Sequence, residues 1–235
     1  MSARIHRVER LECPVEACDW PFARTQRAAI AAHWKKLVAE KPALFDGRVL
    51  LCRAPRIENG VYRATYFETD FSAFIAWRDF GFPDAAVFNG FAMAALRSSD
   101  GAFLLGEMAA HTANAGQCYF PAGTPDPSDV RDGAVDLAGS VARELEEETG
   151  FAMDEAQVDP LWTIVEMGPR IACLRGVSVR ESAAEAAARV VRHMQRERRP
   201  ELAGLRAVFG MNDLARLTTP DFIGVYLAHA FAQPG

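Results

Sequence analysis

Residues 143–151 carry the sequence RELEEETGF, in which Glu144, Glu147 and Glu148 are spaced i, i+3 and i+4. On a helix this spacing places three carboxylates on one face, with neighbouring Cβ atoms roughly 5–6 Å apart. Like charges at this spacing destabilise a helix by about 0.2–0.5 kcal/mol per pair, and the dipole near a helix C-terminus disfavours anions further. A bound Mg²⁺ removes both penalties, because it takes oxygen ligands. The pattern indicates a cation-binding helix; the alternative is a solvated, charged helix face.

The residues around this stretch predict a short helix over 137–149. Asp136 is the expected N-cap, with Ser140 as the alternative. Leu145 contributes to an apolar side, and Gly150 occupies the position where helices commonly end in a left-handed residue. Because both ends are defined, the carboxylates point at a definite place, which favours the cation-binding interpretation.

The order of expected elements after residue 85 predicts a layered domain. Two apolar strands, 91–96 and 102–108, are joined by a turn at 98–101, and the loop before the helix follows. Strands at 161–165 and 171–177 and helices at 183–196 and 221–231 complete the order. This order predicts an α/β or α+β domain with helices on both sides of a mixed sheet.

Residues 143–151 resemble the second half of the Nudix box, R-E-U-x-E-E-x-G-U, where U is a bulky aliphatic residue. Every fixed position is met, and the aromatic Phe151 fills the last one. Upstream, Phe-Pro-Ala-Gly at 120–123 resembles the strand-to-loop entry of the box. The resemblance implies a Nudix hydrolase, with a Nudix-like α/β/α sandwich over residues 85–235 and an N-terminal α/β extension over residues 1–84.

The first half of the box departs from the family pattern, which begins G-x5-E-x7-R-E. Counting back from Arg143 puts the glycine at Asp129 and the first glutamate at Val135. Taking Gly123 as the opening glycine requires about six extra loop residues, which 124–133 supply. Asp136 then lies one place from the first acidic position and is the candidate for its supporting role.

The resemblance allots roles to the residues of the box. Glu144, Glu147 and Glu148 would ligate Mg²⁺, or Mn²⁺ in its place, and the backbone carbonyl of Ala122 would be a further metal ligand. Arg143 would pair with a neighbouring glutamate and hold its orientation. The implied chemistry is attack of water on a phosphorus of a diphosphate.

A general base is also required, and three acidic residues are candidates: Glu148 in the box, Glu166 on a later strand, and Glu107 on an earlier one. For Glu166 and Glu107 the alternative is a solvent-facing or salt-bridged strand residue. His111, in the loop before the box, and Arg170, after Pro169, are candidate substrate-binding residues. Their alternatives are a solvated loop histidine and a surface arginine.

Composition limits the function classes. The 235 residues carry a net charge of −5, which argues against a nucleic-acid-binding surface. The locally basic run 189–199 is interpreted as a solvated helix face. The charged N-terminus is no signal peptide and no run of roughly 20 apolar residues occurs, so a cytoplasmic protein without membrane contact is expected.

The five cysteines are odd in number and widely spaced, which indicates no disulfide framework. Cys13 and Cys18 form a C-x4-C without a second pair of ligands, so ordinary thiols are expected there rather than zinc ligands.

The first 84 residues are expected to pack on the domain and shape its specificity. Residues 1–20 are expected to be irregular, with helices at 22–40 and at 70–79 behind an Asp70 N-cap, and strands at 48–53 and 61–67. Trp34, residues 42–47 and Asp70-Phe71 loosely resemble Nudix proteins that act on nucleotide sugars such as UDP-glucose.

Three functions follow from these patterns. The first is metal-dependent hydrolysis of a small nucleoside diphosphate derivative. The second is a Nudix-like module that senses nucleotides without cutting them, although such modules usually lose glutamates that this chain keeps. The third is a diphosphate isomerase on the same fold, which requires Cys118 to face the site. The family resemblance also makes a homodimer an expectation.

Overall fold

The computed structural model describes residues 3–112 and 114–233 of the chain. The strands are β1 (Arg4–Val8), β2 (Arg10–Glu12), β3 (Arg48–Glu58), β4 (Val61–Asp70), β5 (Val87–Arg97), β6 (Phe103–Met108), β7 (Cys118–Tyr119), β8 (Ala122–Gly123), β9 (Val130–Arg131), β10 (Ala134–Val135), β11 (Gln157–Met167), β12 (Arg170–Ser178) and β13 (Leu202–Val208). The α-helices are α1 (Pro21–Thr25), α2 (Arg27–Glu40), α3 (Phe71–Asp79), α4 (Leu137–Thr149), α5 (Ala183–Met194), α6 (Met211–Leu214) and α7 (Asp221–Ala232), with 3-10 helices η1 (Pro127–Asp129) and η2 (Met153–Glu155).

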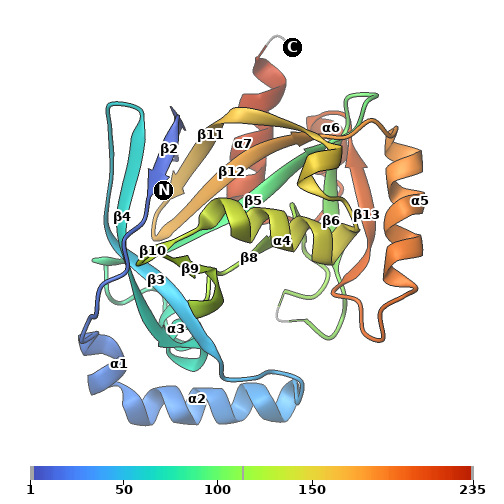
Figure 1. The fold of residues 1–235 in the computed structure, drawn as a ribbon. Coiled ribbons are helices and arrows are strands. Elements are labelled where there is room, and N and C mark those ends of the chain that lie inside the picture. The colour runs from blue at the N-terminus through green and yellow to red at the C-terminus, as the bar shows by residue number, and fades with distance from the viewer. Residues whose placement is uncertain (1–2, 113, 234–235) are drawn as a thin grey trace.

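One mixed sheet organises the molecule. Its main path runs β1-β11-β12-β5-β3-β4-β2. Beside this path, β6 and β8 pair with β5, and β7 and β13 pair with β6. The pairs β12–β5 and β2–β4 are parallel, whereas β1–β11, β11–β12 and β3–β4 are antiparallel. The strands β1 and β2 lie at opposite ends of this path, yet only Glu9 separates them in sequence. The sheet therefore curls until its two ends meet (Figure 1).

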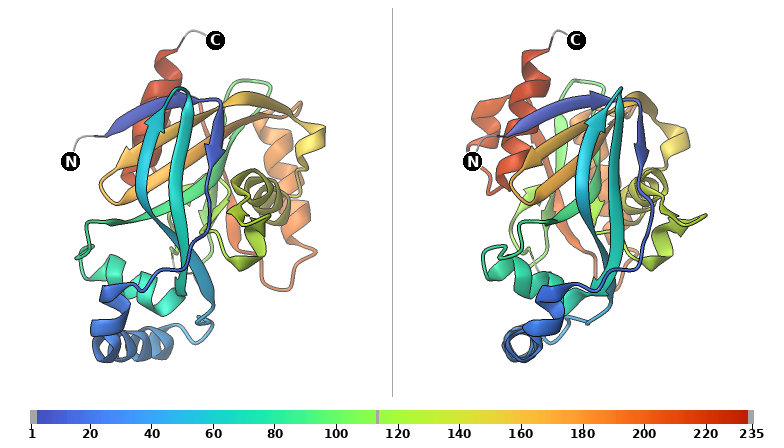
Figure 2. Two further views of the ribbon diagram at one scale, coloured as in Figure 1. Left: turned by 60° about the vertical axis from the view of Figure 1, so that its left-hand side comes forward. Right: turned by 90° about the vertical axis from the view of Figure 1, so that its left-hand side faces the viewer.

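Helices cover both faces of the strand pair β5–β12. The α4 residues Val141 and Leu145 are buried in one apolar cluster with Ala92 of β5. On the other face, Ile223 and Leu227 of α7 are buried with Met93, so neighbouring residues of β5 face opposite layers, as the period of a strand requires. Figure 2 shows α7 on the far side of the sheet from α4. The expected layered fold, with helices on both sides of a mixed sheet, is confirmed.

The N-terminal residues extend the same sheet. Trp20, Phe67 and Trp77 form a third apolar cluster beneath α1–α3, while Tyr62 of β4 is buried in the same cluster as α4. The domain boundary near residue 84 stays a prediction. Within the described residues, no helix is long and apolar enough to cross a membrane.

Three local expectations were wrong. Residues 1–20 are not irregular, because β1 pairs with β11 from Arg4↔Glu166 to Val8↔Trp162 and β2 pairs with β4. These strands depend on partners distant in sequence, so a local pattern does not reveal them. Asp70 precedes α3 but makes no cap hydrogen bond; the Ser72 N–H instead donates to Asp46 Oδ1 over 2.7 Å. The Pro-, Asp- and Gly-rich stretch 124–136 was expected to lack regular structure, yet η1 and the β9–β10 hairpin lie there.

Candidate active site

The helix α4 has the bounds and caps that its sequence predicts. It spans Leu137–Thr149, and the Asp136 side chain accepts a hydrogen bond from the Gly139 N–H over 2.9 Å. Gly150 ends the helix with φ 73°, a left-handed conformation that glycine adopts without steric penalty. Both ends are fixed locally, so the carboxylate face of α4 has a defined direction.

Basic side chains of α5 bind the C-terminal end of α4. His193 Nε2 donates to the Glu147 carbonyl over 2.8 Å, and Arg189 Nη2 donates to the Gly150 carbonyl over 2.6 Å. The Arg189 guanidinium also lies 4.2 Å from the Phe151 ring centroid. The negative end of the helix dipole lies here, so glutamates near it are unfavourable. The positive charge of Arg189 offsets this unfavourable interaction. The basic run of α5 is thus partly structural, and not only the solvated face that was expected.

Arg143 is the centre of an ion-pair network on α4. Its Nη1 lies 2.9 Å from Glu144 Oε1 and 3.1 Å from Glu147 Oε2. Its Nη2 lies 3.1 Å from Asp129 Oδ1, and the Asp129 side chain is only 4% exposed. Asp129 Oδ2 also accepts the Asp126 N–H over 3.1 Å. The guanidinium is therefore held on both sides and orients the glutamates beside it.

Asp129, and not Asp136, takes the position of the first acid of the box. The residues 123–129 (GTPDPSD) reproduce the G-x5-acid spacing once aspartate is accepted in place of glutamate. The extra residues follow this acid and form the hairpin 130–135, with Val135 paired to Val130. Asp136 serves instead as the N-cap of α4. The spacing was present in the sequence, but only the ion pair with Arg143 identifies which aspartate matters.

Glu144 and Glu148 are the buried carboxylates of the helix. Burial raises the pKa of Glu144 to about 7; Arg143 opposes the rise, and the charges of Glu147 and Glu201 add to it. Burial raises the pKa of Glu148 well above its ordinary value, the charges of Glu144 and Glu201 add to the rise, and a hydrogen bond with the Ala122 main chain opposes it. Arg143 offsets the charge of Glu144 only in part, and no basic side chain lowers the pKa of Glu148, so a bound metal would stabilise the ionised form of both carboxylates.

The strand β8 contacts these carboxylates through its backbone. A Cβ at Gly123 would collide with the Glu144 carboxylate, so the absence of a side chain at Gly123 lets Glu144 keep its present position against β8. Ala122, its neighbour, contacts Glu148 through the main chain. Both residues are held by antiparallel pairing with Ala92 and Met93 of β5. The sheet thus fixes the backbone that the resemblance nominated as a metal ligand.

Two further residues join the carboxylates and were not anticipated from the sequence. Glu201, which immediately precedes β13, acts electrostatically on both Glu144 and Glu148. Tyr119 of β7 accepts a hydrogen bond from Asn114 over 3.2 Å; burial raises its pKa, and the charges of Glu148 and Glu201 raise it further. Neither residue lies in a sequence motif. Tyr119 and Glu201 come near the carboxylates because β7 and β13 both pair with β6.

The donor set around α4 fits a hard divalent cation. Two buried carboxylates, Glu144 and Glu148, lie beside the Ala122 main chain, and oxygen is the ligand atom that Mg²⁺ prefers. Glu147 has a side chain that is 61% exposed and pairs with Arg143. Among the described residues, no three His, Cys, Asp or Glu side chains are already gathered as a metal cluster. Glu147 would have to turn from Arg143 to complete the set.

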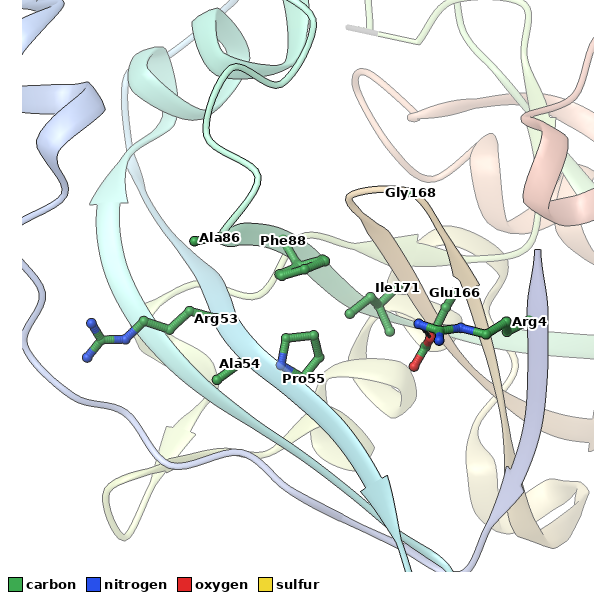
Figure 3. A pocket seen from close by; sticks show the side chains of 9 residues that line it. All are labelled: Arg4, Arg53, Ala54, Pro55, Ala86, Phe88, Glu166, Gly168 and Ile171. Carbon is green, nitrogen blue, oxygen red and sulfur yellow. Dashed lines mark ion pairs between the residues drawn. The ribbon is translucent and has the colours of Figure 1, made fainter. Parts of the chain in front are cut away.

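The remaining base candidates lie in ion pairs elsewhere. Glu166 lies 2.6 Å from Arg4 Nη2 and is 13% exposed. Figure 3 shows this pair at a cavity that Phe88 and Ile171 also line, and Ala122 and Gly123 do not line it. Glu107 accepts a hydrogen bond from Arg206 Nε over 2.7 Å. Glu166 and Glu107 thus have the salt-bridged surroundings of the alternative interpretation, and which carboxylate acts as the base stays a prediction.

The predicted substrate-binding residues separate into two cavities. Arg170 lines a cavity of about 470 Å³ that Ala122, Gly123 and Tyr119 also line. His111 lines a different cavity, together with Lys41 and Arg199. Arg170 is thus brought to the carboxylate site and His111 is not. The binding role of each stays a prediction.

Cys118 lies in the apolar core and not in the cavity beside α4. Its side chain is buried with Phe120 and Leu105 in the cluster under α7. Burial raises the pKa of its thiol, and the charge of Glu107 adds to the rise. The isomerase alternative requires the Cys118 thiol to face the site, and the thiol lies in the apolar core instead.

Comparisons with known proteins found similar solved structures. The chain is similar to a Nudix hydrolase from M. smegmatis, RenU, with 17% identity over 64% of this chain and 92% of that one, and a TM-score of 0.41. It is similar to a MutT protein from Methanosarcina mazei Go1, with 19% identity over 62% and 96% of the two chains and a TM-score of 0.38. A third is the complex of the C-terminal domain of mouse MUTYH with human PCNA, at 12% identity over 62% and 92%, with a TM-score of 0.38.

No family model matches the chain, and no curated protein matches it. The residues of α4 and its surroundings therefore carry the family resemblance. The motif residues R-E-L-E-E-E-T-G lie at the C-terminal end of α4, next to the mixed sheet. Arg143 of this motif pairs with Asp129, and β8 lies against Glu144. The chain has a Nudix-like α/β/α fold with a Nudix-type helix at its candidate active site.

Proposed function

We propose that this chain is a metal-dependent hydrolase that cleaves the diphosphate of a nucleoside diphosphate linked to another group, with nucleotide sugars as the first class to test. The observation that supports this most directly is the pair of buried carboxylates, Glu144 and Glu148, beside the Ala122 main chain. Two buried carboxylates side by side are costly to ionise, and a divalent cation, which can also bind a diphosphate, would offset that cost.

The proposed roles follow from the surroundings of each side chain. Glu144, Glu147 and Glu148, with the Ala122 carbonyl, would hold Mg²⁺ or Mn²⁺. Such an ion neutralises phosphate oxygens and lowers the pKa of attacking water. Arg143 keeps the glutamates oriented.

Glu148 accepts the proton of the attacking water. Burial raises its pKa above the ordinary value, which makes it a stronger base than an exposed glutamate. The proton would come from the attacking water, and the hydroxide left behind would form the new bond to phosphorus as the bond to the leaving phosphate oxygen breaks. No other carboxylate in the described residues combines the same burial with contact to β8.

The two alternatives have less support. A sensing module would have no need for the complete set of glutamates that α4 retains. An isomerase would need the Cys118 thiol at the site, and that thiol is buried beneath α7. Hydrolysis therefore remains the function that the geometry supports best.

The test is a hydrolysis screen with Mg²⁺ and with Mn²⁺ over nucleoside diphosphate sugars, dinucleoside polyphosphates, coenzyme A and NADH. Glu147→Gln and Glu148→Gln should each lower kcat by about 10²–10⁴-fold. Glu146→Gln is the matched control, because Glu146 immediately precedes Glu147 on the same helix and is exposed. Unchanged turnover in both variants, or no product from any substrate with wild type, would refute the proposal.

A further inference from the structure

The cavity beside the carboxylates is built from six segments of the chain. It is about 470 Å³ and lies between the start of α3 and the start of α7. Phe71 and Phe74 come from α3, Asn89 and Phe91 from β5, and Phe222 from α7. Ala122 and Gly123 line the same space. A ligand bound here therefore reaches the backbone that contacts Glu144 and Glu148, and residues of the N-terminal extension form part of its wall.

Two residues that line this cavity each carry a buried polar atom with no partner within the described protein. Asn89 Oδ1 and Arg170 Nε are both inaccessible to solvent and make no hydrogen bond. Asn89 and Arg170 are register partners on the parallel strands β5 and β12, so their side chains project from the same face, next to each other. Buried polar groups in proteins are almost always paired. An acceptor and a donor, side by side and both unpaired, indicate a ligand that supplies the complementary donor and acceptor.

The walls are aromatic and carry little positive charge. The rings of Phe91 and Phe222 are 5.4 Å apart in an edge-on arrangement, and the Arg170 guanidinium lies 5.7 Å from the Phe222 centroid. Arg78 also lines the cavity, but its Nε donates to Asp79 over 2.8 Å. Such walls favour a flat, uncharged ring over a phosphate, because flat aromatic surfaces stack on heterocycles.

We propose that this cavity binds the nucleobase of the substrate, with Asn89 accepting an N–H of the base and Arg170 donating to the neighbouring oxygen or ring nitrogen. The proposal rests on the proposed function, since it supplies the base for a nucleoside diphosphate whose phosphates lie at β8. Every common nucleobase has an N–H donor beside an acceptor, and the aromatic walls enclose its faces. An Asn89 amide and an Arg170 guanidinium thus serve as binding residues and take no part in the proton transfer.

The test uses nucleosides, which lack phosphate, so that binding is measured apart from hydrolysis. Adenosine, guanosine, uridine and cytidine are titrated into metal-free wild-type protein by calorimetry, with ribose as the baseless control. We expect at least one nucleoside to bind while ribose does not. Asn89→Leu and Arg170→Gln should each weaken that affinity at least tenfold. Arg53→Gln, in the cavity of Figure 3, is the matched control and should leave it unchanged.

Folding is controlled by the choice of variant. Leucine keeps the branching of asparagine at Cγ and removes an amide oxygen that lacks a protein partner. The melting temperature of each variant is measured beside the titration, so that loss of the fold is distinguished from loss of binding. Absence of nucleoside binding in wild type would overturn the proposal, and so would affinity that Asn89→Leu and Arg170→Gln leave unchanged. Nucleoside binding without hydrolysis of any diphosphate would support this site and refute the proposed function, so the two failures are distinguishable.

Discussion

Asp129→Asn is expected to lower the free energy of unfolding by about 1–2 kcal/mol, because it removes a buried charge that Arg143 needs. The Asp129 carboxylate is 4% exposed and the Arg143 side chain 36% exposed. A hydrogen bond to a charged group contributes about 1.5–3 kcal/mol when well buried, and the partial exposure of Arg143 lowers that figure through solvent screening.

The same substitution should weaken metal binding. Without Asp129, the guanidinium is held only by Glu144 and Glu147, so Arg143 competes more strongly with the cation for these carboxylates. The apparent affinity for Mg²⁺ should fall on the order of tenfold, as is usual when a residue that orients metal ligands is lost. Urea unfolding gives the stability change, and calorimetric titration with Mg²⁺ gives the affinity.

Asp136→Asn is the matched control, because asparagine caps a helix as well as aspartate does. It should change the free energy of unfolding by less than about 0.5 kcal/mol. A double-mutant cycle with Arg143→Met should show coupling of about 1–2 kcal/mol for Asp129 and none for Asp136. Coupling to Asp136 and none to Asp129 would refute the assignment of the first acid of the box.

Other changes test the same site and the core. In metal-free protein, raising the pH from 5 to 8.5 should destabilise wild type by about 2–3 kcal/mol more than Glu144→Gln. The reason is that burial raises the pKa of the Glu144 carboxyl to about 7 in the folded state, so its ionisation costs stability as the pH rises through that value. Urea unfolding at both pH values measures this, and an equal loss of stability in wild type and variant would contradict it. Saturating Mg²⁺ at pH 8.5 should restore the lost stability of wild type and not of the variant. Gly123→Ala should cost about 1–3 kcal/mol through collision with the Glu144 carboxylate, and a melting temperature equal to that of wild type would rule out this contact. Burial raises the pKa of Cys13 and of Cys52 to about 12. A thiol reagent at pH 8 should therefore label the native protein rapidly only at the half-buried Cys18. Fast labelling that persists in Cys18→Ser would show that the core thiols are accessible.

The sequence alone was sufficient for the helix and its chemistry. The bounds of α4, its Asp136 cap, its Gly150 terminus and its carboxylate face all follow from interactions within a few residues, where 3.6-residue periodicity and capping rules apply. The strand at 91–96 was also predicted from its apolar residues, and β5 buries them in two layers.

Long-range pairing decided the rest. The choice between Asp129 and Asp136 depended on how the hairpin 130–135 returns the chain to α4, and the sequence spacing allowed either. Glu201 reaches the carboxylates only because β13 pairs with β6, and Asn89 meets Arg170 only because β5 and β12 are parallel neighbours. Local propensity describes contacts a few residues apart, whereas the surroundings of α4 are made by strand pairings and burial between segments tens of residues apart. For that reason the motif indicated the cation and the reaction, and the folded sheet was needed to locate the acid that steadies Arg143 and the cavity beside it.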